Sequence, residues 1–156
     1  QHNTTRRQRQ MCIRDRTIAT GSISVEPIIL FLIIFIWTPS HFWALSLYKS
    51  GDYRKAKIPM LPIIAGTKTT KTNILVYSFA MLPIVIAPYY FEFASLLYLV
   101  SALAMTLYYN YLCLELFKAK VTKFSNKIAR KVFIYSIFYL FFVYLILLID
   151  NARSLF

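Results

Sequence analysis

Four long apolar runs, separated by short polar stretches, dominate the pattern of the chain. They cover residues 27–48, 74–91, 93–117 and 132–149, and each is apolar on all sides rather than along one stripe. A helix needs about 20 residues to cross the roughly 30 Å hydrocarbon core of a bilayer. Their length and their lack of strict alternation favour helices over strands. The pattern predicts an all-α, polytopic transmembrane helix bundle with about four spans.

Composition supports this class of protein. Of the 156 residues, 58% are hydrophobic, 17% are aromatic and only 15% are charged. A soluble domain is typically about 45–50% apolar and about 25% charged, and a disordered chain is far more polar. The two cysteines, Cys12 and Cys113, are too few for a disulfide framework or a cysteine-based zinc site. What remains is an integral membrane protein.

The charges are distributed unevenly among the connections. Residues 49–73 carry six basic side chains and one acid, residues 118–131 carry six basic side chains and no acid, and the 91–93 turn carries only Glu92. Basic loops remain on the cytoplasmic side of a membrane. We therefore expect both basic connections on the cytoplasmic or matrix side, and both ends of the chain on the opposite side.

Residues 1–16 conflict with this topology because they hold five arginines on the side expected to be external. No apolar core follows them, which excludes a signal peptide. Their location argues against an arm that binds nucleic acid, so we expect no nucleic-acid partner. The stretch from Met11 to Arg16 resembles translated sequencing-adapter sequence. We interpret residues 1–16 as a non-native or disordered segment and residues 17–156 as the membrane domain.

The first basic connection holds a candidate phosphate site. Asp52 is its one carboxylate, and four cations lie nearby, namely Lys49, Arg54, Lys55 and Lys57. Such a cluster suits an anionic phosphate ligand, with the carboxylate holding a hard cation such as Mg²⁺. Alternatively, the cations only fix topology and contact lipid phosphates. An acidic residue does not help to fix the topology, so the presence of Asp52 favours the ligand site.

A second candidate lies inside the first apolar run. His41 is an ionisable side chain within a span, and such a residue is either functional or hydrogen-bonded between helices. Pro39 predicts a kink just before it. Trp37 and Trp43 fit interfacial anchors, and they equally fit a pocket whose aromatic faces stabilise a carbocation.

Together these stretches resemble the protoheme IX farnesyltransferases (heme O synthases) of the UbiA-type intramembrane prenyltransferase superfamily. The resemblance covers about residues 17–151. Ser40 stands where this family usually has a second proline. The matching segments are residues 21–27, 37–45, 52–53 and 58–62, then Gly66 with the Thr- and Lys-rich stretch before Ile74, and residues 131–150.

The resemblance implies a nine-helix fold of which this chain is the C-terminal part, with a first Asn- and Asp-rich metal motif lying outside it. The implied reaction transfers a farnesyl group from farnesyl diphosphate to a vinyl group of heme B, giving heme O, the precursor of heme A. It implies a bacterial inner or mitochondrial inner membrane, with heme A synthase as a candidate partner. We expect the chain alone to be inactive.

The resemblance also implies roles for individual residues. Asp52 and His41 are the candidate catalytic residues, and Asp52 falls on the acidic position of the family's second motif as a Mg²⁺ ligand. The four cations become the diphosphate-binding set. The candidate pocket-lining residues are Trp37, Phe42, Trp43, Tyr53 and Asn110, although packing explains the Asn110 region equally well.

Three alternatives remain open. Another prenyltransferase of the same superfamily would act on a quinone precursor or a chlorin, but those enzymes typically carry two or more carboxylates in this connection. A transporter would show inverted repeats, and a non-catalytic respiratory subunit would need no ordered basic connection.

Overall fold

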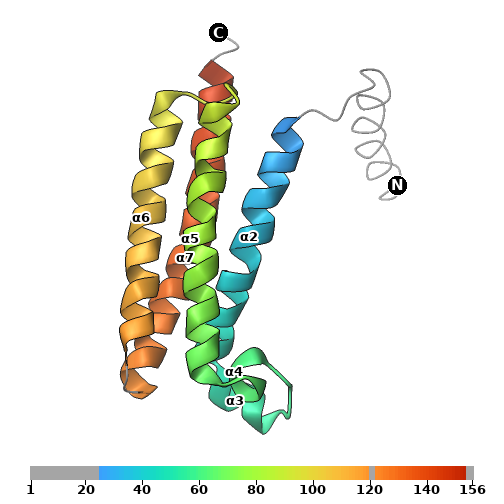
Figure 1. Cartoon of the computed structure of the whole chain (residues 1–156), viewed down its shortest axis with the longest axis vertical. Coiled ribbons are helices and arrows are strands. Elements are labelled where there is room, and N and C mark those ends of the chain that lie inside the picture. The colour runs from blue at the N-terminus through green and yellow to red at the C-terminus, as the bar shows by residue number, and fades with distance from the viewer. Residues whose placement is uncertain (1–24, 120–121, 154–156) are drawn as a thin grey trace, which may run out of the picture.

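The computed structural model describes residues 25–119 and 122–153, which form helices and no strand. The interpretation of residues 1–16 lies outside these ranges. The all-α prediction is confirmed for the described residues (Figure 1). In chain order the helices are α2 (Val25–Tyr48), α3 (Ser50–Lys55), α4 (Leu61–Ile64), α5 (Gly66–Tyr90), α6 (Leu96–Lys118) and α7 (Thr122–Arg153).

Four of these helices are long and apolar enough to cross a membrane, as predicted. The candidate spans are Val25–Tyr48, Gly66–Tyr90, Leu96–Lys118 and Ser125–Asn151. Many large apolar side chains on their outer surfaces are exposed, for example Phe31 at 62% and Leu148 at 69%. Such a surface is stable in contact with lipid tails and not with water.

Two of the helices extend beyond the apolar runs that predict them. Helix α5 begins at Gly66 rather than at Ile74, and α7 begins at Thr122 rather than at Val132. Polar and charged residues end an apolar run, but they do not end the backbone hydrogen bonding of a helix, so both helices continue beyond their apolar runs. Lys68 and Lys71, expected in a loop, therefore lie on α5.

The four long helices form a closed bundle in which each contacts two neighbours. Helix α2 packs on α5 and α7, and α6 packs on the same two helices from the other side. The core contains three fully buried tyrosines, Tyr98, Tyr109 and Tyr139, among aliphatic side chains. Helix α2 continues through Pro39 as one helix.

Polar bonds between helices fix this packing. The Tyr109 hydroxyl donates to Ser40 Oγ at 3.0 Å, and the Tyr139 hydroxyl lies 3.0 Å from Thr106 Oγ1. The Tyr144 hydroxyl donates to the carbonyl of Leu30 at 2.7 Å. Inside a membrane there is no hydrophobic driving force between helices, so such bonds and close packing hold the bundle together.

The two ends of the bundle differ in charge and in construction. Helices α3 and α4 lie at one end, which is also where α6 ends and α7 begins, and the α5–α6 turn lies at the other end with the last turns of α7 (Figure 1). At that second end, the backbone N–H and the hydroxyl of Ser95 both donate to the carboxylate of Asp150. The C-terminal end of α7 thus satisfies the N–H of Ser95, the N-cap residue of α6, whose own side chain makes no capping bond.

Candidate functional site

The connection between α2 and α5 (residues 49–65) is compact rather than an open loop. Helix α3 ends at Lys55, and Ile58 cannot continue it because the residue before a proline avoids the helical region. Pro62 occupies the first turn of α4, where its missing N–H costs nothing. Gly66 then starts α5 with a φ of 84°, which other residues rarely adopt.

Asp52 lies on α3 and is already paired. Its Oδ2 accepts a hydrogen bond from Lys49 Nζ at 3.2 Å, and both side chains are largely exposed, at 67% and 47%. This hydrogen bond raises the pKa of the Lys49 amine above its usual value, and the carboxylate charge adds to the effect. Lys49 is also 5.4 Å from the centre of the Tyr48 ring. The predicted proximity of Asp52 to a cation is confirmed for Lys49.

The other predicted cations lie in the same connection as Asp52, and no ion pair with them is found among the described residues. Lys55 ends α3, and Lys57 follows it with a φ of 55°; both side chains are exposed. The side chain of Arg54 lies outside what the structure describes, so its predicted role is not tested. Exposed amines on a short turn can reorient toward an anion at little cost.

The predicted Mg²⁺ site has one carboxylate, Asp52, in the α2–α5 connection. Among the described residues, no three His, Cys, Asp or Glu side chains come together as a metal-binding group. Mg²⁺ is commonly bound by one or two carboxylates together with substrate phosphates and water. Asp52 fits one such ligand, and a diphosphate and further ligands would have to complete the shell.

His41 sits within the bundle in an aromatic stack. Its ring lies between the rings of Trp37 and Phe133, with centroid distances of 4.4 and 4.7 Å and interplanar angles of 20° and 27°. Its Nδ1 is 2.7 Å from Ser136 Oγ, and that hydroxyl is 2.7 Å from the carbonyl of Phe133.

These contacts decide which nitrogen of His41 carries the proton. A carbonyl only accepts, so the single Ser136 hydroxyl proton points to Phe133 if both contacts are hydrogen bonds. Nδ1–H of His41 then donates to Ser136 Oγ, and Nε2 is left as an acceptor. The ring is half-buried, and Nε2 has no hydrogen-bond partner among the described residues.

The predicted pocket-lining aromatics separate into different environments. The Trp37 indole N–H donates to the carbonyl of Ser136 at 3.0 Å, which ties α2 to α7. Trp43 packs edge-on against Tyr77 at 5.2 Å. Phe42 is 56% exposed on the outer surface, and Tyr53 is half-buried.

Asn110 is buried in the bundle, 4% exposed. Its Nδ2 donates to the carbonyl of Thr106 at 3.0 Å, whereas its Oδ1 has no hydrogen-bond partner among the described residues. A buried acceptor without a partner is costly, so this oxygen is available to a donor that the structure does not contain.

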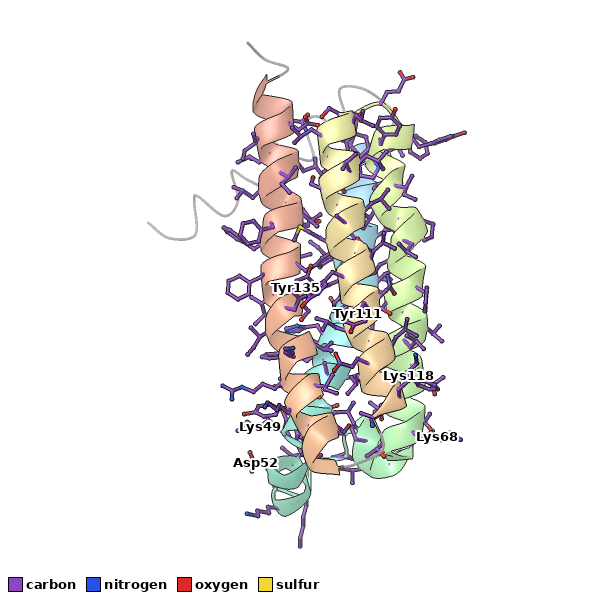
Figure 2. The ribbon with its side chains drawn as sticks, turned by 90° about the vertical axis from the view of Figure 1, so that its left-hand side faces the viewer. Lys49, Asp52, Lys68, Tyr111, Lys118 and Tyr135 are labelled. Carbon is purple, nitrogen blue, oxygen red and sulfur yellow. The ribbon has the colours of Figure 1, made fainter. Side chains whose placement is uncertain are left out.

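Several residues of the site were not found from the sequence. Phe133 and Ser136 complete the surroundings of His41, and their spacing of three on a helix places them on one face. This spacing is the only feature of the sequence that links Phe133 with Ser136, and it does not indicate which other helix the two residues contact. No hydrogen bond or ring contact joins the His41 stack to α3 within the part of the chain that the structure describes. Figure 2 places Asp52 at the end of the bundle that carries α3.

The chain matches the model of the UbiA prenyltransferase family over residues 16–137. It therefore belongs to the UbiA prenyltransferase family, and the class of protein expected from the sequence is confirmed.

Several relatives among curated proteins are named protoheme IX farnesyltransferase. The chain is 64% identical over 135 residues to a protein of Pelagibacter ubique named protoheme IX farnesyltransferase, covering 86% of this chain and 45% of that protein. It is 43% identical to a protein of the same name from Parvibaculum lavamentivorans, over 87% of this chain and 43% of the relative. The Rickettsia bellii protein of that name is 44% identical, over 82% of this chain and 42% of the relative. The chain thus spans less than half the length of these relatives. No solved structure matches it.

Proposed function

We propose that the protein to which this chain belongs transfers a farnesyl group from farnesyl diphosphate to a vinyl group of heme B, giving heme O. The observation that carries the proposal is the identity of 64%, over 86% of the chain, to a relative named protoheme IX farnesyltransferase. Membership of a prenyltransferase family leaves the transporter and the non-catalytic subunit without support.

In this proposal, the α2–α5 connection binds the diphosphate of farnesyl diphosphate. Breaking the bond between farnesyl C1 and the diphosphate oxygen places negative charge on the leaving group, and cations aimed at that charge lower the barrier. We assign this role to Lys49, Arg54, Lys55 and Lys57. Asp52 would hold Mg²⁺, which when bound supplies further neutralisation of the diphosphate. Lys49 then exchanges its hydrogen bond with Asp52 for one with a phosphate oxygen.

The second half of the reaction requires a proton acceptor. The vinyl terminal carbon bonds to farnesyl C1, water adds to the inner vinyl carbon, and that water must lose one proton to leave the hydroxyl of heme O. We assign this proton to His41 Nε2, the nitrogen left as an acceptor by the Nδ1 contact with Ser136. Stacking between Trp37 and Phe133 holds the imidazole in place.

Aromatic side chains protect the farnesyl cation before the vinyl group reaches it. A closed apolar chamber excludes water, and ring faces attract the cation. We assign this lining to Trp37, Phe42, Trp43 and Tyr53, with the Oδ1 of Asn110 as an acceptor for a polar group of a substrate. The exposed ring of Phe42 would be covered by the part of the protein outside this chain or by heme.

The basic end of the bundle belongs on the cytoplasmic or matrix side of the inner membrane in this account, where farnesyl diphosphate is dissolved. The segregation of lysines and arginines supports that side. Heme A synthase, which consumes heme O, is the candidate partner in this account.

A chimera tests the proposed function. The segment of the Pelagibacter ubique relative that matches this chain is replaced by residues 17–151, and the chimera is expressed in cells that lack heme O synthase. We expect extracted hemes to include heme O, identified by mass spectrometry. The intact relative is the positive control, and the 156-residue chain alone should give none.

Two outcomes would contradict the proposal. One is heme B alone in cells whose membranes contain the chimera at the level of the active relative. The other is a prenylated quinone precursor or chlorin in place of heme O, which would move the chain to the alternative acceptor class.

A further inference from the structure

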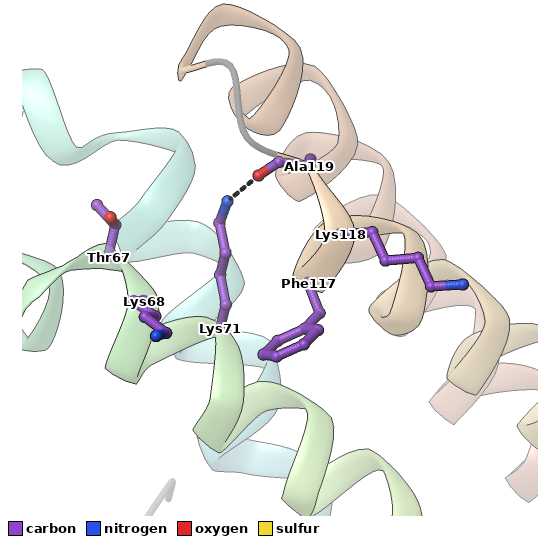
Figure 3. A pocket seen from close by; sticks show the side chains of 6 residues that line it. All are labelled: Thr67, Lys68, Lys71, Phe117, Lys118 and Ala119. Carbon is purple, nitrogen blue, oxygen red and sulfur yellow. Dashed lines mark hydrogen bonds between the residues drawn. The ribbon is translucent and has the colours of Figure 1, made fainter.

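A hollow of about 600 Å³ lies between the first turns of α5 and the end of α6, away from the proposed reaction site. It is open to the surface of the bundle at the basic end. Figure 3 shows its lining, which combines three lysines with one aromatic ring and two small side chains, namely Thr67, Lys68, Lys71, Phe117, Lys118 and Ala119.

One of the lysines is held in place rather than free in solvent. Lys71 Nζ donates to the carbonyl of Ala119 at 2.8 Å, and its side chain reaches from α5 across to the end of α6 (Figure 3). An ammonium group has three N–H donors. This bond uses one of them, so a fixed positive charge with two remaining donors faces the hollow.

The surroundings leave this charge uncompensated. Lys68 lies on α5 one turn before Lys71, and Lys118 lies on α6 next to Ala119. Among the described residues no acidic side chain lines the hollow, Glu115 on α6 forms no ion pair with Lys118, and the ion pair that is found, Lys49–Asp52, is elsewhere. In Figure 2, Lys68 and Lys118 lie on one side of the bundle end, and Lys49 and Asp52 lie on the other. The hollow is therefore separate from the candidate diphosphate site.

The apolar part of the lining indicates the kind of anion. Phe117 contributes to the hollow and is 42% exposed. Farther from the basic end, α5 and α6 expose large apolar side chains such as Val76, at 57%, and Leu107, at 59%. A ligand at this place meets cations at the membrane interface and apolar surface within the membrane. A free phosphate would contact only the cations and not the apolar surface.

We propose that the hollow binds an anionic glycerophospholipid, with its headgroup phosphate against Lys68, Lys71 and Lys118 and an acyl chain along Phe117. Basic pockets between transmembrane helices on the cytoplasmic side commonly bind anionic headgroups. The site assigned here differs from general attraction to the membrane surface because the ligand phosphate fits between two particular helices.

Native mass spectrometry of the detergent-purified chain tests this site. The probes are phosphatidylglycerol and phosphatidylcholine with the same acyl chains. The site variant is Lys68→Gln with Lys118→Gln, which keeps the Lys71–Ala119 bond. The matched control is Lys127→Gln with Lys131→Gln, which removes the same charge from exposed positions on α7. Circular dichroism checks that both variants remain equally helical.

We expect the first phosphatidylglycerol to bind more tightly than phosphatidylcholine, and the site variant to weaken it by roughly 10- to 30-fold, since each lysine near an anionic headgroup contributes about fivefold. The control should change it by less than about twofold. Equal weakening in both variants, or none in the site variant, would overturn the proposal. So would displacement of the lipid by millimolar inorganic phosphate, because the hollow would then be a site for free anions.

Discussion

Asp52 and His41 carry the proposed chemistry, and they stand in different surroundings. Asp52 is exposed on a short helix and paired with Lys49, so its carboxylate can exchange partners. His41 is stacked against the rings of Trp37 and Phe133, which fix the plane of the imidazole, and the hydrogen bond of Nδ1 with Ser136 fixes which ring edge faces α7. The first arrangement suits a residue that meets a ligand from solution. The second suits a proton acceptor of fixed direction.

Replacing Asp52 tests the metal assignment. Asp52→Asn in the chimera keeps the size of the side chain and removes the charge that would hold Mg²⁺. We expect heme O formation to fall by roughly 10²- to 10⁴-fold, the range typical of losing a charge-stabilising group at a reacting centre. The measurement is turnover at several Mg²⁺ concentrations, at equal abundance in the membrane.

Two control variants distinguish Mg²⁺ binding by Asp52 from a general charge effect and from positioning of Lys49. Glu92→Gln removes an exposed acid at the opposite end of the bundle and should leave turnover unchanged. Lys49→Gln breaks the same ion pair from the other side. If Asp52→Asn loses no more activity than Lys49→Gln, Asp52 only positions Lys49, because an exposed pair contributes little by itself.

His41 calls for a different substitution. His41→Asn places an amide N–H where Nδ1–H donates to Ser136 and removes Nε2. We expect turnover to fall by about 10²- to 10⁴-fold, the usual contribution of a general base, with the bundle still folded. Near-normal turnover in His41→Asn, at normal abundance, would show that His41 is a packing residue.

The sequence predicts local contacts between residues but not contacts between residues far apart in the chain. The pairing of Lys49 with Asp52 is local, because side chains three apart on a helix are neighbours, and it could be predicted. The stack around His41 depends on Phe133 and Ser136, which are far away in the chain. It requires the pairing of α2 with α7 in one register, and no periodicity in a uniformly apolar helix specifies that register.

At the scale of the helices, length and hydropathy predicted four spans, and the described residues contain four helices long and apolar enough to be spans. The exposed apolar surfaces explain why, since a lipid-facing helix needs no polar face. The same reasoning placed Lys68 and Lys71 in a loop, because it equated the end of an apolar run with the end of a helix. The hollow between α5 and α6 exists only because α5 extends to Gly66.

The turn between α5 and α6 offers a test of how helices are fastened. Asp150 accepts two hydrogen bonds from Ser95, one from its N–H and one from its hydroxyl. Asp150→Ala should lower the free energy of unfolding by about 1 kcal/mol, as expected for losing a helix cap. Ser95→Ala should cost less, because the backbone bond remains.

Thermal unfolding in detergent of both single variants and the double variant measures this effect. The double variant should be no less stable than Asp150→Ala, since the serine hydroxyl has lost its acceptor already. Additive losses would mean that Ser95 and Asp150 stabilise the protein independently, and the proposed cap would be wrong.

At the scale of the whole molecule, the bundle has one basic end, which carries α3, α4 and the lysine-lined hollow, and one end with few basic residues. Reporter fusions to truncated chains test its orientation. Fusions after Lys57 and after Ala119 should report the cytoplasmic side, and a fusion after Glu92 the external side. An external signal after Lys57 would place the proposed diphosphate site where farnesyl diphosphate is absent.

The central claim is that a chain spanning less than half of its relatives' length completes a heme farnesyltransferase. Its most direct test supplies membranes containing the chimera with heme B, Mg²⁺ and farnesyl diphosphate labelled in the farnesyl group. We predict that label enters the heme fraction with one diphosphate released per label, and that Asp52→Asn membranes transfer far less. Diphosphate release without labelled heme, or label in a quinone or chlorin fraction when those acceptors are present, would contradict the account.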